Sequence, residues 1–562
     1  MRVLVAASIV LALVLAGCSE DRSSDAGPTP GFNPVVGPGP GDDGPDPAPF
    51  DPTGVPAWGF QLCDQGYRLV QPASGYPYTP ADRSCDFRVT KPLLDASLFD
   101  WQTQHGPGNE VSLAVNPTDP LNLAGGAKDY TVSYISDVAG CGDFTVWNGH
   151  FASLDGGRTW SNDLIPGFPG DDRPSPLAGN ECNTDPVSVF DSDGTYWHNG
   201  LNYRGARQDV GDPDNPLGED GLLTGSQIFF ARSQDKGATF DRITTASYGD
   251  NEPTIFNDKN WLAVDPASDH MIHTWTNFYA AGALIEFVES PDAGATWTHP
   301  APITPGGTAG TGVAPSANTP TGQFSMPQYD SDGNVWVIWS SGGGVVQSMA
   351  PRADLPATAP SVFQPTVRLF SYPAGLDGGD GCLSRTNFRA SIYPVLAMDT
   401  SGGAYDGRQY VVFPAAGAQG ASIWLGSGEG VGPWAAPREI LDLPDDQFMP
   451  WIDVGPDGTV HVAYYDCSID AGGTNMTMGH TWSDDGGATW HGPFWIGQAA
   501  FHGDLGHHQN GAAFIGDYIA VDASATGVHF FWADTRLGRS DVWAATIAKD
   551  WDAAPLYAPE LA

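Results

Sequence analysis

The sequence predicts an all-β fold, a β-propeller with four-stranded blades, with seven blades as the first choice and six as the alternative because the unit boundaries are soft. Three observations predict it. An eight-residue motif occurs four times, short apolar strands recur along the chain, and hardly any stretch has a helical period. Four copies of one motif indicate an internal repeat, and closing repeated sheets into a ring protects their edges.

The motif has the pattern S-x-D-x-G-x-T-[WF] and occupies residues 153–160, 233–240, 290–297 and 483–490. Its Asp accepts hydrogen bonds from N–H groups just downstream, which makes a tight turn rigid. Its Gly takes a backbone conformation that is costly for other residues. The Thr and the aromatic residue then begin a strand. The motif therefore predicts a hairpin turn whose aromatic side chain packs into the neighbouring repeat.

Seven repeated units follow residue 105, and each opens with a short apolar strand that ends near Asp, Asn or Gly. The openings are residues 111–116, 186–191, 261–265, 326–330, 393–399, 451–455 and 518–522. The last unit is one strand short. We therefore expect a segment before residue 110 to complete its blade. Residues 85–90, in the irregular stretch before the repeats, could form one strand.

The four motif copies resemble the Asp-box, or BNR repeat, of sialidases and related β-propeller proteins, and the resemblance covers residues 105–550. It implies that the boxes join the third and fourth strands of a blade, on the rim away from the active site. It also implies an exo-sialidase-like glycoside hydrolase, in which arginines clamp the substrate carboxylate. The chain has no F/Y-R-I-P motif, and Arg88, Arg389 and Arg536 are the candidate cationic cluster.

The first 104 residues read as an export and anchoring region. Residues 1–18 resemble a lipoprotein signal peptide with a lipobox, which implies lipid attachment at Cys18; an ordinary signal with a chance Cys is the alternative. Residues 19–55 predict a disordered tether, residues 56–104 an irregular segment packing on the propeller, and residues 551–562 a tail. We therefore expect an exported lipoprotein at the cell surface or outer membrane.

The net charge of the chain limits the classes of molecule that it can bind. A net charge of −42 excludes nucleic acid and acidic membrane surfaces as partners.

Six cysteines beyond Cys18 predict three disulfides in an exported chain, and proximity suggests the pairs Cys63–Cys85, Cys141–Cys182 and Cys382–Cys467. Without a C-x-x-C pair, zinc is not expected and no cofactor is assigned. The acidic loops 209–220 and 377–380 are candidate Ca²⁺ sites, with solvated turns as the alternative.

Propeller ligands usually bind over the central axis, where each innermost strand begins. Counting back six residues from the end of each opening strand gives one axial residue per blade: Glu110, Asp185, Lys259, Phe324, Tyr393, Met449 and Gly516. Neighbouring candidates are Asp446, Gln447, Asp517 and Tyr518. Solvated loop residues at strand ends are the alternative interpretation.

The predicted roles follow from residue chemistry. Acid–base work is assigned to Glu110, Asp185, Asp517, Tyr518 and Tyr393, and substrate binding to Lys259, Arg389, Arg536 and Asp534.

Three functions remain open at this point. The first is a surface glycoside hydrolase acting as a monomer on an extracellular glycan or glycoprotein. The second is a non-catalytic propeller that binds glycans or proteins. A weaker third is a polysaccharide lyase using His507 or His508. Paired carboxyls, or a tyrosine–carboxylate pair, facing each other across the axis would favour the first.

Overall fold

The computed structural model describes residues 71–72, 86–88 and 108–548. Within the last range it leaves out 133–145, 158, 205–223, 247–255, 280–281, 304–321, 356–360, 374–379, 382–389, 392, 442, 471–474, 498–499, 504–506, 510–511 and 537–539. The described residues form seven four-stranded antiparallel blades, which confirms the predicted fold and the first choice of seven. Apart from strands they contain the short 3-10 helices η3 (Arg352–Asp354) and η4 (Cys467–Asp470).

Each of the first four blades is a simple meander of consecutive strands, innermost strand first. Blade 1 is β3 (Gly108–Val115), β4 (Leu123–Asp129), β5 (Trp147–Ser153) and β6 (Ser161–Leu164). Blade 2 is β7 (Cys182–Phe190), β8 (Tyr196–Arg204), β9 (Thr224–Ser233) and β10 (Arg242–Thr245). Blade 3 is β11 (Phe256–Val264), β12 (Met271–Tyr279), β13 (Gly282–Ser290) and β14 (Ala301–Pro302). Blade 4 is β15 (Gln323–Tyr329), β16 (Val335–Ser340), β17 (Gly344–Ala350) and β18 (Val367–Ser371).

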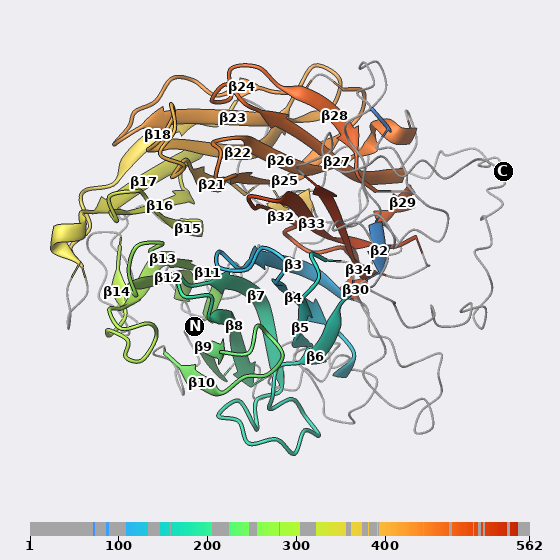
Figure 1. Ribbon diagram of the computed structural model, residues 1–562. Helices are drawn as coiled ribbons and strands as arrows, with labels where there is room; N and C mark the ends of the chain where they lie inside the picture. Colours follow the sequence, from blue (N-terminus) through green and yellow to red (C-terminus); the bar gives the residue numbers. More distant parts are fainter. Residues whose placement is uncertain are drawn as a thin grey trace, which may run out of the picture.

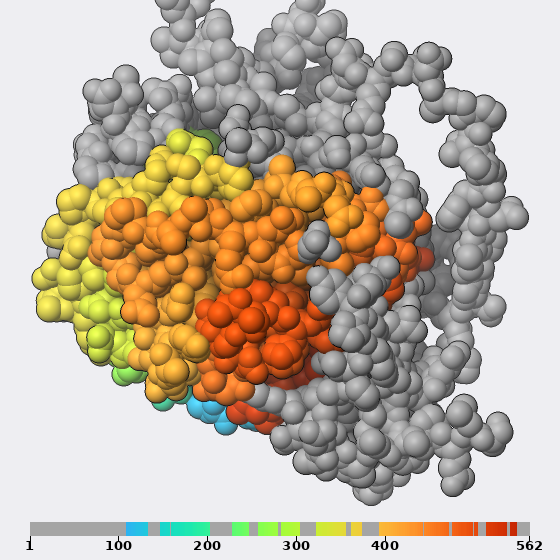
Figure 2. All heavy atoms as spheres, turned by 90° about the horizontal axis from the view of Figure 1, so that it is seen from above, coloured from blue at the N-terminus to red at the C-terminus, as the bar shows by residue number. Residues whose placement is uncertain are grey.

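Blades 5 to 7 complete the ring, and Figure 2 shows blades 4 to 6 forming a continuous yellow-to-orange surface. Blade 5 is β21 (Val395–Met398), β22 (Arg408–Ala416), β23 (Ala421–Glu429) and β24 (Arg438–Glu439). Blade 6 is β25 (Gln447–Val454), β26 (Val460–Asp466), β27 (Asn475–Ser483) and β28 (His491–Trp495), with β1 (Gln71–Pro72) and β29 (Phe501–His502) added at its outer side. Blade 7 has β32 (Ala520–Ala523), β33 (Gly527–Asp534) and β34 (Asp541–Ala548). Two short pairs lie outside the blades: β19 (Asp380–Gly381) with β20 (Ala390–Ser391), and β30 (His507–Gln509) with β31 (Ala512–Phe514).

The ring is closed by the N-terminal part of the chain. Strand β2 (Asp86–Arg88) pairs antiparallel with β34 and is the missing fourth strand of blade 7, which confirms that a segment before residue 110 completes this blade. In Figure 1 the blue β2 lies beside the dark red β34, and the innermost strands surround a common centre. Each innermost strand contacts the next one, and β32 contacts β3. The ring therefore closes both through its first and last blades and through a strand from earlier in the chain.

All four motif turns join the third and fourth strands of a blade, as expected. In the copy at 290–297, Asp292 accepts the N–H of Thr296 at 2.7 Å and its hydroxyl at 2.7 Å, while Ser290 Oγ accepts the N–H of Gly294 at 2.8 Å. The other three Asp-box turns repeat these bonds. Because the turn is held by residues within itself, one short sequence pattern is enough to specify it.

The aromatic residue of each Asp-box turn packs on the preceding blade. Trp297 of blade 3 stacks on Phe230 of blade 2, with ring centroids 3.9 Å apart. Trp160 of blade 1 lies 5.1 Å from Phe531 of blade 7, across the ring closure. These contacts join neighbouring blades on the face that carries the turns, and they confirm the predicted packing into a neighbouring repeat.

The predicted disulfide pattern is wrong at one position. Cys467 is a thiol in η4, 4% exposed and packed in the core of blade 6, so the predicted Cys382–Cys467 pair is not formed. Cys182 is disulfide-bonded. Cys141, its predicted partner, lies outside the described residues, as do Cys63, Cys85 and Cys382.

Among the described residues, no helix has the length and apolarity to cross a membrane.

Candidate functional site

A bulge recurs at one place in five innermost strands and turns one side chain of each towards the axis. The pairing register shifts between Asn109 and Ser112 in β3 and at the matching places in β7, β11, β15 and β25. The bulged residues have left-handed backbones, with φ of 50° at Glu110, 54° at Asp185, 52° at Lys259, 62° at Phe324 and 50° at Met449. Such angles are costly for residues other than glycine. The uncharged residues Phe324 and Met449 have the same left-handed backbone angles, so the bulge is a feature of the fold and does not depend on charge. The residue type at the bulge then decides which side chain points to the axis.

In blade 7 the axial position is occupied by Tyr518 and not by Gly516. In every blade the residue six positions after the axial one donates its N–H across the first turn: Asn116, Asp191, Asp265, Asp330, Asp399, Gly455 and Ser524. The prediction of Gly516 took Asp522 as the end of the opening strand, but Asp522 lies within β32 and accepts the N–H of Val115 at 2.9 Å. Gly516 has φ 99°, and a Cβ there would lie 2.5 Å from the backbone nitrogen of Glu110. Glycine is required there because two backbones meet.

The axial ring consists of Glu110, Asp185, Lys259, Phe324, Tyr393, Met449 and Tyr518, one residue per blade. Its charged half is an ion cluster centred on the Lys259 ammonium. Nζ lies 3.4 Å from Glu110 Oε1 and 3.8 Å from Asp185 Oδ2, and it contacts Asp517 Oδ2 directly. Lys128 Nζ lies 3.2 Å from Glu110 Oε2. All of these residues are at most 7% exposed. Buried charges are stable only when paired in this way.

Burial and neighbouring charges set the carboxyls of this cluster apart. Burial raises the pKa of Glu110 to about 6, although Lys128 and Lys259 oppose it. Burial also raises the pKa of Asp258 to about 7, against the attraction of Lys259. At Asp185 the burial effect is outweighed by Lys259, Lys128 and hydrogen bonds from Thr184 and Tyr518, so its pKa is lowered. One cluster therefore holds carboxyls that release protons near neutral pH beside a carboxyl that stays ionised.

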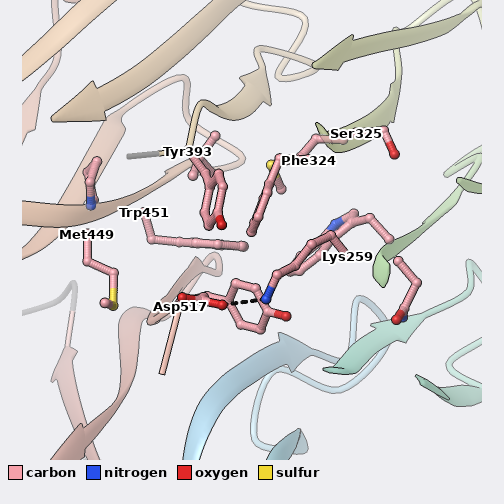
Figure 3. A pocket seen from close by; sticks show the side chains of 13 residues that line it. Lys259, Phe324, Ser325, Tyr393, Met449, Trp451 and Asp517 are labelled. Atoms are coloured by element: carbon pink, nitrogen blue, oxygen red, sulfur yellow. Dashed lines mark hydrogen bonds and ion pairs between the residues drawn. The ribbon is translucent and has the colours of Figure 1, made fainter. Parts of the chain in front are cut away.

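The other half of the ring is apolar and aromatic. Phe324 stacks on Tyr393, and the Lys259 ammonium lies 5.2 Å above the Phe324 ring and 5.1 Å from that of Tyr518. Figure 3 shows the Lys259 side chain reaching across this space to Asp517. Two residues further along their strands, Trp261 and Trp451 pack 4.9 Å apart and fill the axis below the ring.

The ring residues of blades 3 to 7 line a pocket with little free room. It encloses about 420 Å³ not filled by atoms, including open solvent, but side chains leave only about 20 Å³ for water, about the room of one molecule. A ligand the size of a sugar therefore needs the lining side chains to move. Lys259 is the side chain that crosses the space.

The other predicted site residues have different surroundings. Asp534 and Arg536 form an ion pair with each other, and the Arg536 guanidinium lies 3.9 Å from the Trp543 ring of the same blade. Asp446 accepts the N–H of Ala421 at 2.8 Å, and Gln447 donates to Asp466 at 3.3 Å.

Other predictions fall partly or wholly outside the described residues. Arg389 and loop 209–220 lie outside them, and so does loop 377–380 except Asp380 in β19. Arg88 lies in β2, and His507 and His508 lie in β30. The described residues contain no group of three His, Cys, Asp or Glu side chains that could hold a metal ion.

The sequence did not point to Lys128, a member of the ion cluster, or to Asp258, whose pKa the cluster influences. Asp258 directly precedes Lys259 and is 7% exposed. Lys128 lies in β4 opposite Asn109, one strand away from the axis. The available signal was a lysine inside a strand whose residues are otherwise almost all uncharged.

Comparison with known proteins gives structural matches only. No protein-family model and no curated protein sequence matches the chain. One structural match is a protein of unknown function from Dyadobacter fermentans, with 13% identity, TM-score 0.39, and coverage of 71% of this chain and 97% of that one. Another is the α-L-arabinofuranosidase Arb93A of Fusarium graminearum, with 14% identity, TM-score 0.41, and coverage of 68% of this chain and 94% of that one. A third is the NanB sialidase of Streptococcus pneumoniae, with 11% identity, TM-score 0.38, and coverage of 66% of this chain and 67% of that one. Similarity this low does not extend to site residues.

Proposed function

We propose that this protein is a glycoside hydrolase acting on extracellular glycans, with the axial ring as its active site. One observation carries the proposal: three buried carboxyls and a tyrosine converge on a single ammonium at the axis of the ring. Glu110, Asp185 and Asp517 each have a carboxylate oxygen in contact with Lys259 Nζ. The contacting oxygens of any two of these acids are therefore separated by no more than the sum of their two distances to Nζ. Glycoside hydrolysis uses a pair of carboxyls at this kind of separation.

The proposed roles follow from the proton affinities. Glu110, with a pKa raised to about 6, is the proton donor to the leaving group. Asp185, whose pKa is lowered, stays ionised and accepts a hydrogen bond from Tyr518. The Asp185 carboxylate therefore either stabilises positive charge on the sugar or activates the tyrosine hydroxyl. Phe324 and Tyr393 supply the apolar wall against which a sugar face stacks.

A non-catalytic glycan-binding propeller is the second candidate. The small free volume of the pocket favours it, because the ion cluster already fills the axis. In that case the cluster joins blades 1, 2, 3 and 7, and ligands bind elsewhere on the surface.

The test is a hydrolysis screen of the full-length protein against a panel of glycosides, with Glu110→Gln and Asp185→Asn variants. We expect each variant to lose at least about 100-fold in turnover while its melting temperature still reports a folded propeller. The matched control is Asp241→Asn, which removes an exposed ion pair with Arg232 and should keep full activity. Full activity in both ring variants would refute the axial site. Binding without turnover in the unaltered protein would support the second candidate.

We also propose that the protein is exported and lipid-anchored at Cys18. The apolar run ending in Leu15-Ala16-Gly17-Cys18 supports this. Mass spectrometry of the mature N-terminus should detect an acylated cysteine. An unmodified chain that begins at another residue would contradict the proposal.

A further inference from the structure

We infer that the axial site selects an uncharged sugar and discriminates against a sugar that carries a carboxylate. This inference rests on the proposed function and names its substrate class. It differs from what the Asp-box resemblance implies, because a sialic acid is an anion.

The charges around the ring carry the inference. Three carboxyls, those of Glu110, Asp185 and Asp517, gather around the Lys259 ammonium, and the Lys128 ammonium lies beside Glu110. Asp258, the residue before Lys259, is also buried, and its pKa responds to Lys259 and to these three acids. Both ammoniums are already committed to carboxyls: Lys128 lies 3.2 Å from Glu110, and Lys259 contacts three acids. A carboxylate on the ligand would add another acid to a cluster in which the described residues supply no excess of positive charge.

Burial makes this repulsion large. The acids are between 1% and 7% exposed, so little water screens them from a ligand that enters the ring. A second anion beside Asp185 or Asp517 would have to compete for the Lys259 ammonium or be taken up with a proton. An uncharged sugar meets neither cost, because its hydroxyl groups both donate and accept hydrogen bonds.

The apolar half of the ring suits the same ligand. Phe324, Tyr393 and Met449 present rings and a thioether opposite the acids. A sugar without charge has one face of C–H groups for such a wall and hydroxyl groups for the acids. Arg536, one of the arginines expected to clamp a carboxylate, is instead paired with Asp534 and packed on Trp543.

The test compares matched pairs of substrates that differ only at C6, an aryl glucoside against the aryl glucuronide and an aryl galactoside against the aryl galacturonide, with an aryl sialoside alongside. In each pair we expect the uncharged member to have at least about a ten-fold higher kcat/KM. Asp258→Asn keeps the shape of the side chain and removes one acid from the cluster. This variant should narrow the ratio, whereas Asp241→Asn on the surface should leave it unchanged.

Equal or higher kcat/KM for the glucuronide, galacturonide or sialoside would overturn this inference and leave the proposed hydrolase intact. An unchanged ratio in Asp258→Asn would also overturn it. If no glycoside is hydrolysed, ligand-observed NMR measures the affinity of the protein for glucose and galactose and compares it with the affinity for glucuronate and galacturonate. A preference for the uncharged sugars then supports the selectivity although the hydrolase proposal has failed. No binding of any of them overturns both.

Discussion

The aspartates of the Asp-box turns and the acids of the axial ring are the same chemical group in opposite situations. In the turn at 483–490, hydrogen bonds from the Thr489 hydroxyl and N–H lower the pKa of Asp485 to about 2, and the carboxylate faces solvent. In the ring, burial raises the pKa of Glu110 to about 6. The turn residues are neighbours in sequence, while those of the ring come from blades at both ends of the chain.

This difference teaches how function is separated from scaffold in a repeat protein. A turn satisfied by its own residues can be copied without change, and four copies share one pattern. The ring uses the same bulge in five blades but presents side chains of different chemistry there, so the repeat supplies position and the individual residue supplies chemistry. Breaking the two regions should therefore have very different consequences.

The largest effect is expected from removing the ammonium at the centre of the ring. Lys259→Met leaves three acids without their shared partner, and we expect a loss of about 3–5 kcal/mol in the free energy of unfolding. The measurement is urea denaturation at neutral pH. The matched control is Lys236→Met in an Asp-box turn, whose ion pair with Asp119 is largely exposed and should contribute less than about 1 kcal/mol. Equal losses in the two variants would contradict the comparison.

The second effect is a dependence of stability on pH that comes from the ring. The pKa of Asp258 is about 7 in the folded protein, above its ordinary value, so the folded state keeps a proton that the unfolded chain has released. The contribution of Asp258 to stability must therefore fall as pH rises from about 4 to 7. Asp258→Asn should remove on the order of 1–2 kcal/mol of this fall, measured as the difference in unfolding free energy between pH 5 and pH 8. The same slope in both proteins would show that Asp258 is not the group responsible.

The smallest effect is expected in a single Asp-box turn. Asp292→Asn weakens two hydrogen bonds to Thr296 at the surface, and solvent replaces much of what is lost, so the cost should be below about 1 kcal/mol. Because the pKa of Asp292 is lowered in the fold, its contribution is present at neutral pH and disappears in acid, opposite to the trend at Asp258. Thermal melting at pH 7 and pH 3 should show a larger difference between variant and parent at pH 7.

Much of this architecture was predictable, and the failures have identifiable causes. The innermost strands and the Asp-box hairpins follow from local patterns, and six of the seven axial positions were found by counting. That a segment before residue 110 completes blade 7 followed from the missing strand of the last unit. Blade 7 was misplaced by two residues because Asp522 resembles a turn residue but bonds to blade 1. Cys467 was paired wrongly because an even number of cysteines does not show which sulfurs lie close together.

The sequence by itself determined the repeat, the class of fold and the residues that six of the seven blades present at the axis, because turns and strand periods depend on neighbours along the chain. Only the tertiary structure decided that Lys259 neutralises acids from blades 1, 2 and 7, that Lys128 joins them, and that their charges act on buried Asp258. It also decided which acids hold protons near neutral pH. The physical reason is that proton affinity depends on burial and on charges a few ångströms away, and closure of the ring brings those charges together from distant parts of the chain.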